Sequence, residues 1–250
     1  EFSIESDINT LLSISKNSQI TVENAKSINE ILNRYFNLHQ RNQSFQEVEK
    51  HISKRFDEIL SHFDLHNGTK FASAYFLFCY TLIDNKKGFN GVQNEIYYNV
   101  AVPFKSWVHK KASTFQELIS TIPLGEVYIF ICRRATVKGL YAPGKSIYTY
   151  AEALLARGES VWIIVLFNTD TQFTNLKKKY KKLRISVLFK AQLEINLVSV
   201  IEILKLAEPK VILTEIEFDL TAIIGILNKK VPIIFLSQGF YNLPWYNSIG

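Results

Sequence analysis

The fold is decided where the chain reads Pro123-Leu124-Gly125-Glu126-Val127-Tyr128-Ile129-Phe130-Ile131-Cys132. After the proline and glycine, the run from Val127 to Cys132 is continuously apolar. Four similar short runs follow it, namely Val161 to Phe167, Ile185 to Phe189, Val211 to Leu213 and Pro232 to Leu236. Short apolar runs without polar alternation are typical of strands that are buried on both faces, as in a parallel sheet.

Helical patterns alternate with these runs, over Ser146 to Ala156, Glu194 to Leu206 and Asp219 to Leu227. A repeated strand–helix–strand order predicts an open parallel sheet with helices on both faces, which is a Rossmann-like α/β fold. In such sheets ligands bind beyond the carboxyl ends of the strands. We therefore expect functional residues in the loops after the first, fourth and fifth strands.

The chain before Pro123 has the period of helices. One apolar stripe comprises Val22, Ala25, Ile28, Ile31, Leu32, Tyr35 and Phe36, and a second comprises Val48, Ile52, Phe56, Ile59, Leu60 and Phe63. Spacings of three and four residues indicate amphipathic helices, and a more apolar helix is expected over Phe71 to Ile83. The predicted domains are an all-helical domain at 1–122 and a Rossmann-like α/β domain at 123–250.

Composition restricts the class of protein. The chain is 47% hydrophobic and 21% charged, within the globular range. Cys79 and Cys132 each lie in an apolar run, which favours buried free thiols over a disulfide. The apolar segment from Phe71 to Ile83 is too short to cross a bilayer, and the acidic N-terminus is unlike a signal peptide. We expect a cytoplasmic protein, with a peripheral position at the inner face of the membrane as an alternative.

The segment from Gly139 to Ser146 matches the phosphate-loop pattern G-x-x-x-x-G-K-S. That loop needs backbone N–H groups aimed at phosphate oxygens directly after a strand. Here six residues, 133–138, separate the predicted strand from Gly139, and Pro143 has no N–H to donate. The candidate strands also end in Thr214-Glu215 and Ser237-Gln238, without the aspartate that holds magnesium. Nucleotide binding by this loop stays an alternative, and the milder interpretation is a helix N-terminus that holds an anion.

Two longer segments carry a family resemblance. The helix-to-strand phrase from Tyr150 to Val161, with Gly158 after the helix, resembles "ALAARGHEV", and the stretch from Glu208 to Ile234 resembles "PDVVHAH…AALLLARKLGIPVV". Over about half of the chain, the sequence is thus similar to the N-terminal, acceptor-side domain of glycosyltransferases with two Rossmann domains (the GT-B fold). The histidines that relatives often carry after strands four and five are replaced, which leaves Thr214-Glu215 and Gln238.

The resemblance implies the acceptor-binding portion of a bacterial-type glycosyltransferase of hexosyltransferase type. Such an enzyme transfers a sugar from a nucleotide-activated donor to a glycan, a lipid-linked acceptor or a protein. It needs no metal or other cofactor, and a nucleotide-sugar domain is expected after residue 250. A helical domain placed before such a unit resembles some bacterial protein glycosyltransferases. A non-catalytic interaction module is the remaining alternative.

The resemblance also implies roles for residues near the expected loops. Basic side chains and glycines would hold the diphosphate or the acceptor, and the candidates are Arg133, Arg134, Lys138, Gly139, Gly144, Lys145, Gln238 and Gly239. An ordinary solvated basic rim explains the four cations equally well. A general base is expected after the fourth strand. Glu215, Glu217 and Asp219 surround the end of that strand. Asp219 is placed to cap the following helix, so Glu217 is the preferred candidate, with Glu215 as the second.

One strongly basic run lies between the second and third predicted strands. The chain has a formal net charge of +6 at pH 7. Most of this excess comes from Lys177, Lys178, Lys179, Lys181, Lys182 and Arg184. A solvated helical face is one interpretation, and an anionic membrane surface is a second, with Lys177, Lys178, Lys181, Lys182 and Arg184 as its contacts. Nucleic acid is not expected, because no nucleic-acid module is recognisable. His62 and His66 are four residues apart, but no third metal ligand accompanies them, so no metal site is predicted.

Overall fold

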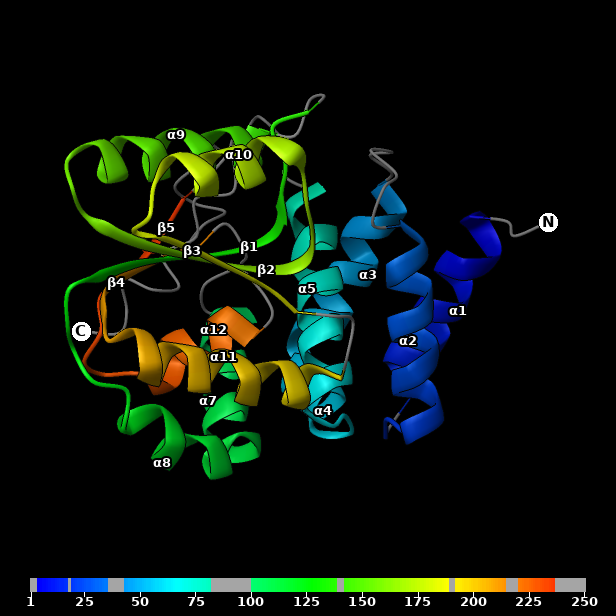
Figure 1. The fold of residues 1–250 in the computed structure, drawn as a ribbon. Coiled ribbons are helices and arrows are strands. Elements are labelled where there is room, and N and C mark those ends of the chain that lie inside the picture. Colours follow the sequence, from blue (N-terminus) through cyan, green and yellow to red (C-terminus); the bar gives the residue numbers. More distant parts are fainter. Residues whose placement is uncertain are drawn as a thin grey trace. The chain divides into compact units, whose positions relative to one another are not determined.

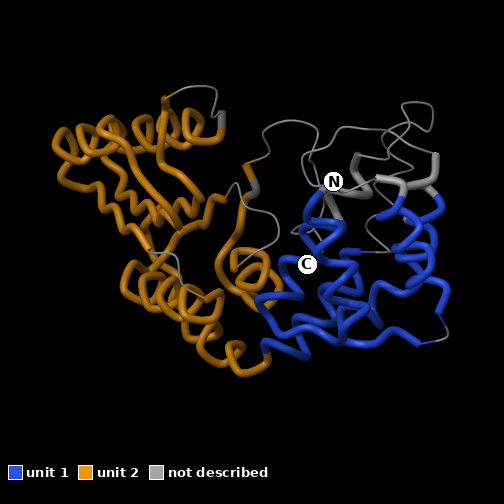
Figure 2. Tube along the Cα trace, turned by 90° about the vertical axis from the view of Figure 1, so that its right-hand side faces the viewer, with its two compact units in different colours: residues 1–112 blue, residues 113–250 orange. Residues whose placement is uncertain are grey.

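The computed structural model describes residues 4–17, 19–35, 43–81, 100–138, 142–188, 192–214 and 220–236. The chain divides into two compact units, Glu1–Ala112 and Ser113–Gly250 (Figure 2). Each unit has its own core and is described by itself. Over the described parts of the chain, every helix is too short or too polar to cross a bilayer.

The first unit is helical where it is described. Its helices are α1 (Ile4–Lys16), α2 (Val22–Tyr35), α3 (Gln43–Lys54), α4 (Phe56–Ser61), α5 (Leu65–Thr81) and α7 (Val102–Lys111). The predicted stripe on α2 is confirmed at Ala25, Ile28, Ile31 and Leu32, which are all buried, whereas Val22 is exposed. The apolar helix α5 begins six residues before the predicted Phe71.

The second predicted helix is in fact two helices, and this corrects the sequence prediction. All six residues of its stripe, from Val48 to Phe63, are buried as expected. The backbone nevertheless leaves the helical conformation at Arg55, with φ −117° and ψ 11°. The break between α3 and α4 lets the Arg55 side chain reach two carbonyl oxygens at the end of α1, those of Ser15 in its last turn and of Asn17 directly after it.

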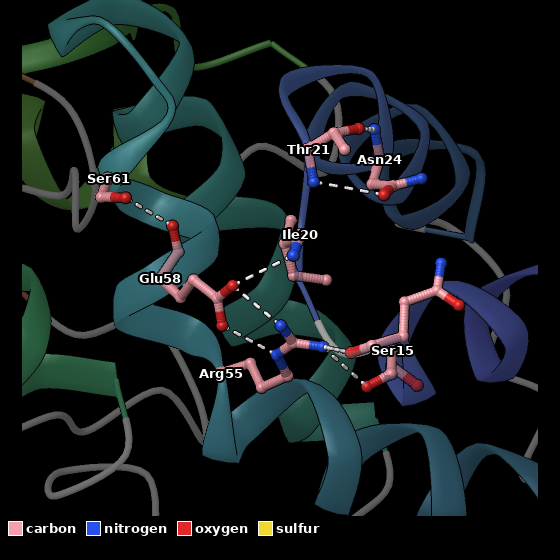
Figure 3. A network of polar contacts seen from close by, with 8 residues as sticks. Ser15, Ile20, Thr21, Asn24, Arg55, Glu58 and Ser61 are labelled. Atoms are coloured by element: carbon pink, nitrogen blue, oxygen red, sulfur yellow. Dashed lines mark hydrogen bonds and ion pairs between the residues drawn. The ribbon is translucent and has the colours of Figure 1, made fainter.

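Arg55 also binds the carboxylate of Glu58 with two of its nitrogens, each at 2.8 Å (Figure 3). The same carboxylate accepts a hydrogen bond of 3.0 Å from the backbone nitrogen of Ile20, ahead of α2. These contacts lower the pKa of Glu58, and the hydrogen bond from Arg55 is the largest cause. One ion pair thus fixes the turn between α1 and α2 to the break between α3 and α4.

The second unit contains a five-stranded sheet in the order β3-β2-β1-β4-β5. The strands are β1 (Val127–Ala135), β2 (Ser160–Thr169), β3 (Leu183–Val187), β4 (Pro209–Thr214) and β5 (Ile233–Phe235). All four neighbouring pairs are parallel, which confirms the predicted α/β class and all five strands. The helix α8 (Ser113–Ser120) belongs to this unit, because the division falls at Ala112.

Helices cover both faces of the sheet (Figure 1). One face carries α9 (Ala142–Ala156) and α10 (Thr171–Lys179), and the other carries α11 (Leu193–Ala207) and α12 (Leu220–Leu227), on which α8 packs. Phe130, Cys132 and Val165 share one core with Ile147 of α9 and Phe173 of α10. Burial on both faces explains why the strands are apolar without alternation.

Of the two cysteines, Cys132 has a described side chain and Cys79 does not. Cys132 is a buried free thiol in the core of the second unit, as predicted. Cys79 belongs to α5, and its side chain lies outside the described part of the structure. Gly158 follows α9 with a φ of +82°, which confirms its predicted role as the residue that ends the helix.

Candidate functional site

The sheet reverses its direction of growth at β1. From β1 the chain proceeds outward through β2 and β3 on one side, and through β4 and β5 on the other. In open parallel sheets such a switch point leaves a crevice at the carboxyl ends of the two diverging strands. Pairing of β1 with β4 ends at Ile131 opposite Thr214, whereas β1 continues to Ala135 beside β2. The last residues of β1 therefore extend past the end of β4.

The projecting end of β1 carries two of the predicted cations. Arg133 and Arg134 are both exposed, after four fully buried residues. The register between β1 and β2 shifts between Cys132 and Arg134. Such irregularities re-aim side chains and are frequent beside functional sites. Two exposed guanidinium groups at the switch point are suited to contact an anion.

Asp170 fixes the loop that follows these arginines. It comes directly after β2, and its Oδ2 accepts hydrogen bonds from the Thr136 hydroxyl at 3.0 Å and from the Val137 backbone nitrogen at 2.9 Å. Its Oδ1 accepts from the backbone nitrogens of Gln172 at 2.9 Å and Phe173 at 3.2 Å, and so caps α10. One carboxylate therefore joins the loop after β1 to the start of the next helix.

The hydrogen bonds determine what Asp170 can do. Partial burial raises the pKa of Asp170, but hydrogen bonds from Val137, Phe173, Thr136 and Gln172 outweigh that effect and leave the pKa below its ordinary value. Each carboxylate oxygen already accepts two hydrogen bonds, so its lone pairs are occupied. Asp170 is accordingly a positioning residue, and it is neither a proton acceptor nor a magnesium ligand.

Sequence reasoning missed Asp170. An aspartate that could hold magnesium was expected at the end of the fourth or fifth predicted strand, whereas Asp170 follows the second. A signal was present, because Asp170-Thr171-Gln172-Phe173 places an aspartate before a possible helix start. The short helix α10 was not predicted either, since its first nine residues after Asp170 contain only two buried apolar side chains, Phe173 and Leu176.

The phosphate-loop pattern falls partly in a helix. Gly139 lies outside the described residues, but α9 already begins at Ala142, so Pro143 and Gly144 belong to its first turn. Gly144 is buried and Lys145 is exposed. A proline in the first turn suits a helix start, because the N–H it lacks would have had no partner within the helix. This part of the pattern is thus explained by helix initiation.

The remaining basic candidates, Lys138 and Lys145, lie at the same end of the sheet. Lys138 is exposed in the loop after β1, and Lys145 is exposed at the start of α9. Among the described residues, no carboxylate forms an ion pair with Arg134, Lys138 or Lys145. Their positive charge is therefore not neutralised within that part of the chain. The arrangement fits either an anion site or a solvated basic rim.

The other predicted site residues lie outside the described residues. They are the acidic candidates Glu215 and Glu217, with Gly139, Gln238 and Gly239. The strand β4 ends at Thr214, which is fully buried, and β5 ends at Phe235, so both strands finish at the edge where β1 ends. The predicted roles of these five residues stay predictions. Within the described ranges, no group of three metal-binding side chains occurs.

The basic run from Lys177 to Arg184 is not one helical face, and this corrects that interpretation. Lys177, Lys178 and Lys179 end α10, Lys181 and Lys182 lie in the turn after it, and Arg184 belongs to β3. In the strand–helix–strand order, the turn between α10 and β3 lies at the amino-terminal edge of the sheet. The run is therefore at the edge opposite the projecting end of β1.

Contacts within the folded protein explain the positions of about half of the cations in this run. Lys179 forms an ion pair with Glu152 of α9 at 3.0 Å, and Arg184 lies over the Trp162 ring at 5.0 Å. The Lys182 ammonium donates a hydrogen bond to the Gly158 carbonyl. Lysines in the last turn of α10 also suit the negative end of the helix dipole. Lys177, Lys178 and Lys181 are exposed and have no ion pair with the described residues.

Comparison with known proteins gives no family. No protein-family model matches the sequence, and no curated protein matches it significantly. The parallel five-stranded sheet is compatible with a Rossmann-like domain.

Proposed function

We propose that this chain is the acceptor-binding portion of a bacterial-type glycosyltransferase, which transfers a sugar from a nucleotide-activated donor to a glycan, a lipid-linked acceptor or a protein. The observation that carries the proposal is the exposed basic end of β1. There, Arg134, Lys138 and Lys145 lie at the switch point of a parallel sheet without a carboxylate partner among the described residues. An exposed basic surface at this edge is a favourable place for an anionic substrate.

In the proposed reaction, the acceptor hydroxyl attacks the anomeric carbon of the donor and the nucleoside diphosphate leaves. Negative charge grows on the leaving diphosphate, and fixed cations stabilise that charge most where water is scarce. Arg134, Lys138 and Lys145 are assigned to this charge or to an acceptor phosphate. Asp170 holds the loop that carries Lys138. Glu217, with Glu215 as the second choice, is assigned to remove the proton from the acceptor.

The rival function is nucleotide binding by the segment from Gly139 to Ser146. Two features of the described residues weigh against it. Pro143 and Gly144 are already helical, so neither is part of an open loop before the helix. Asp170, the one aspartate among the described residues of the second unit, has both oxygens occupied by hydrogen bonds from protein groups. A magnesium–triphosphate complex needs a carboxylate that is free for the metal.

Release of nucleoside diphosphate tests the proposal. Because the proposal assigns this chain the acceptor side, it is tested joined to the nucleotide-sugar domain expected of such an enzyme. That protein is incubated with a panel of nucleotide sugars, with and without glycan, lipid-linked and peptide acceptors, and the released diphosphate is measured. We expect release with one donor class, and stimulation of that release by one acceptor class. ATP or GTP hydrolysis, lost when Lys145 is changed to Ala, would replace this function with the rival one.

A further inference from the structure

The two faces of the sheet carry opposite charge. The segment 142–182, which contains α9, α10 and the turns after them, has seven cations and three carboxylates, a net of +4 with β2 included. The segments 113–126, 192–208 and 220–232, which contain the helices of the other face, have three cations and five carboxylates, a net of −2. The unit is thus polarised across its sheet, with α9 and α10 on the positive side (Figure 1).

Two of the three carboxylates of the positive side are engaged within the protein. Glu152 is paired with Lys179 at 3.0 Å, and Asp170 accepts four hydrogen bonds. By contrast, Lys177, Lys178 and Lys181 are exposed, and no carboxylate among the described residues pairs with them. Cations without internal partners keep their full attraction for an external anionic surface.

An exposed aromatic side chain accompanies these charges. Tyr150 of α9 is 51% exposed. Ala153 follows Tyr150 by three residues, and Arg157 follows Ala153 by four. Residues at that spacing share one side of a helix. Ala153 and Arg157 are also exposed, so this stripe of α9 faces solvent. Tyrosine is favoured where an apolar ring meets polar headgroups, and arginine beside it can pair with lipid phosphates.

We propose that the α9/α10 side of the second unit lies against an anionic lipid bilayer. The lipid-facing surface comprises Tyr150 and Ala153 of α9 with Arg157 directly after it, and the cations Lys177 and Lys178 of α10 with Lys181 in the turn after it. Since α9 starts after the end of β1 and runs back along the sheet, the bilayer extends beside the loop that carries Lys138. Membrane contact is a property separate from sugar transfer, so the proposed membrane contact can be disproved while the proposed sugar transfer stands, and the reverse.

The observations favour a bilayer over nucleic acid. The cations lie in the last turn of α10, in the turn after it and directly after α9, and one tyrosine stands out among the exposed residues of this face. A single-stranded nucleic acid needs a basic groove with several aromatic side chains on which successive bases stack. A flat anionic surface needs only exposed cations and an interfacial aromatic side chain.

Vesicle sedimentation measures the predicted attraction. The full chain is mixed with phosphatidylcholine vesicles with or without phosphatidylglycerol, at low and high salt. We expect binding that requires phosphatidylglycerol and weakens with salt, since the Debye length falls from about 10 Å at 0.1 M to about 3 Å at 1 M. Changing Lys177, Lys178 and Lys181 together to Gln should lower the partition coefficient about 100-fold. The control with the same charge change is Lys26→Gln, Lys50→Gln and Lys70→Gln, exposed lysines of the first unit.

A pair of labelled variants tests which side contacts lipid. In a Cys79→Ala background, an environment-sensitive fluorophore is attached at Ala153→Cys on α9 or at Val198→Cys on α11, both exposed positions. Spin-labelled lipid should quench the label at position 153 and leave the label at position 198 unchanged. Equal quenching, equal vesicle binding by the two triple variants, or tighter binding to a single-stranded RNA than to the vesicles would overturn the proposal.

Discussion

The backbone nitrogen of Val137 donates a hydrogen bond of 2.9 Å to Oδ2 of Asp170. The two residues are far apart in sequence, in the loop after β1 and directly after β2, and the same carboxylate caps α10. The loop that leads to Lys138 is therefore fixed to the neighbouring strand by a charged group. This arrangement gives the candidate site a rigid support on the side of β2.

Loss of the Asp170 carboxylate should destabilise the second unit. Changing Asp170 to Ala removes a helix cap and leaves the backbone nitrogen of Val137 without its acceptor, so we expect a loss of about 2–3 kcal/mol of unfolding free energy. Urea denaturation followed by tryptophan fluorescence measures it, and Asn175→Ala on the exposed side of α10 is the control. A loss below about 0.5 kcal/mol, the range of ordinary surface changes, would contradict the assigned role.

The stabilisation by Asp170 should depend on pH in one direction. The folded pKa of Asp170 lies below its ordinary value, so the stabilisation is complete above the unfolded pKa of about 3.9 and is lost as the pH falls through the folded pKa. The difference in unfolding free energy between wild type and Asp170→Asn should be largest near neutral pH. It should shrink below about pH 4. A difference that stays constant down to pH 3 is incompatible with this account.

Two glycines should respond to alanine for different reasons. A Cβ added to Gly125 would lie 2.5 Å from the backbone oxygen of Glu208, at the point where the chain enters β1, so Gly125→Ala should cost about 3 kcal/mol. Gly158 has open space around it but a φ of +82°, so Gly158→Ala should cost about 1 kcal/mol. Thermal denaturation of both variants compares them. The reverse order would show that the close approach at Glu208 relaxes easily.

The Arg55 side chain should stabilise the first unit. Changing Arg55 to Ala leaves the Ser15 and Asn17 carbonyls and the Glu58 carboxylate without this donor, and we expect a loss of about 2 kcal/mol. Arg55→Lys should recover only part of it, because an ammonium group cannot reproduce the planar set of donors. Lys54→Ala, at the neighbouring exposed position, is the control for chemical denaturation. Full recovery by lysine would mean that charge alone suffices.

The strands were predictable because parallel strands buried on both faces give short, continuous apolar runs. The α2 stripe was predictable for a similar reason, since Ala25, Ile28 and Ile31 repeat with the period of a helix. The break at Arg55 was not predictable, because it depends on carbonyl groups of Ser15 and Asn17, about 40 positions earlier. Local pattern contains no information on such distant partners.

The candidate site was predictable in part. Arg133, Arg134 and Lys138 were found from their place after the first strand, and the structure leaves them at the expected edge of the sheet. The basic run was misread as one face because a count of charges does not show where α10 ends and β3 begins. Asp170 was missed because its importance comes from the contact with Val137, which only the pairing of β1 with β2 creates.

Transfer of sugar by variants of the basic end of β1 tests the central claim most directly. The measurement is kcat/KM for release of nucleoside diphosphate with the preferred donor and acceptor, for wild type and for Arg134→Ala with Lys138→Ala, each in the protein that includes the expected nucleotide-sugar domain. Loss of two cations that contact a diphosphate should lower kcat/KM at least about 100-fold, while Lys26→Ala with Lys50→Ala should leave it unchanged. A wild-type rate in the Arg134/Lys138 variant, or no release from any nucleotide sugar by the wild type, would contradict the account.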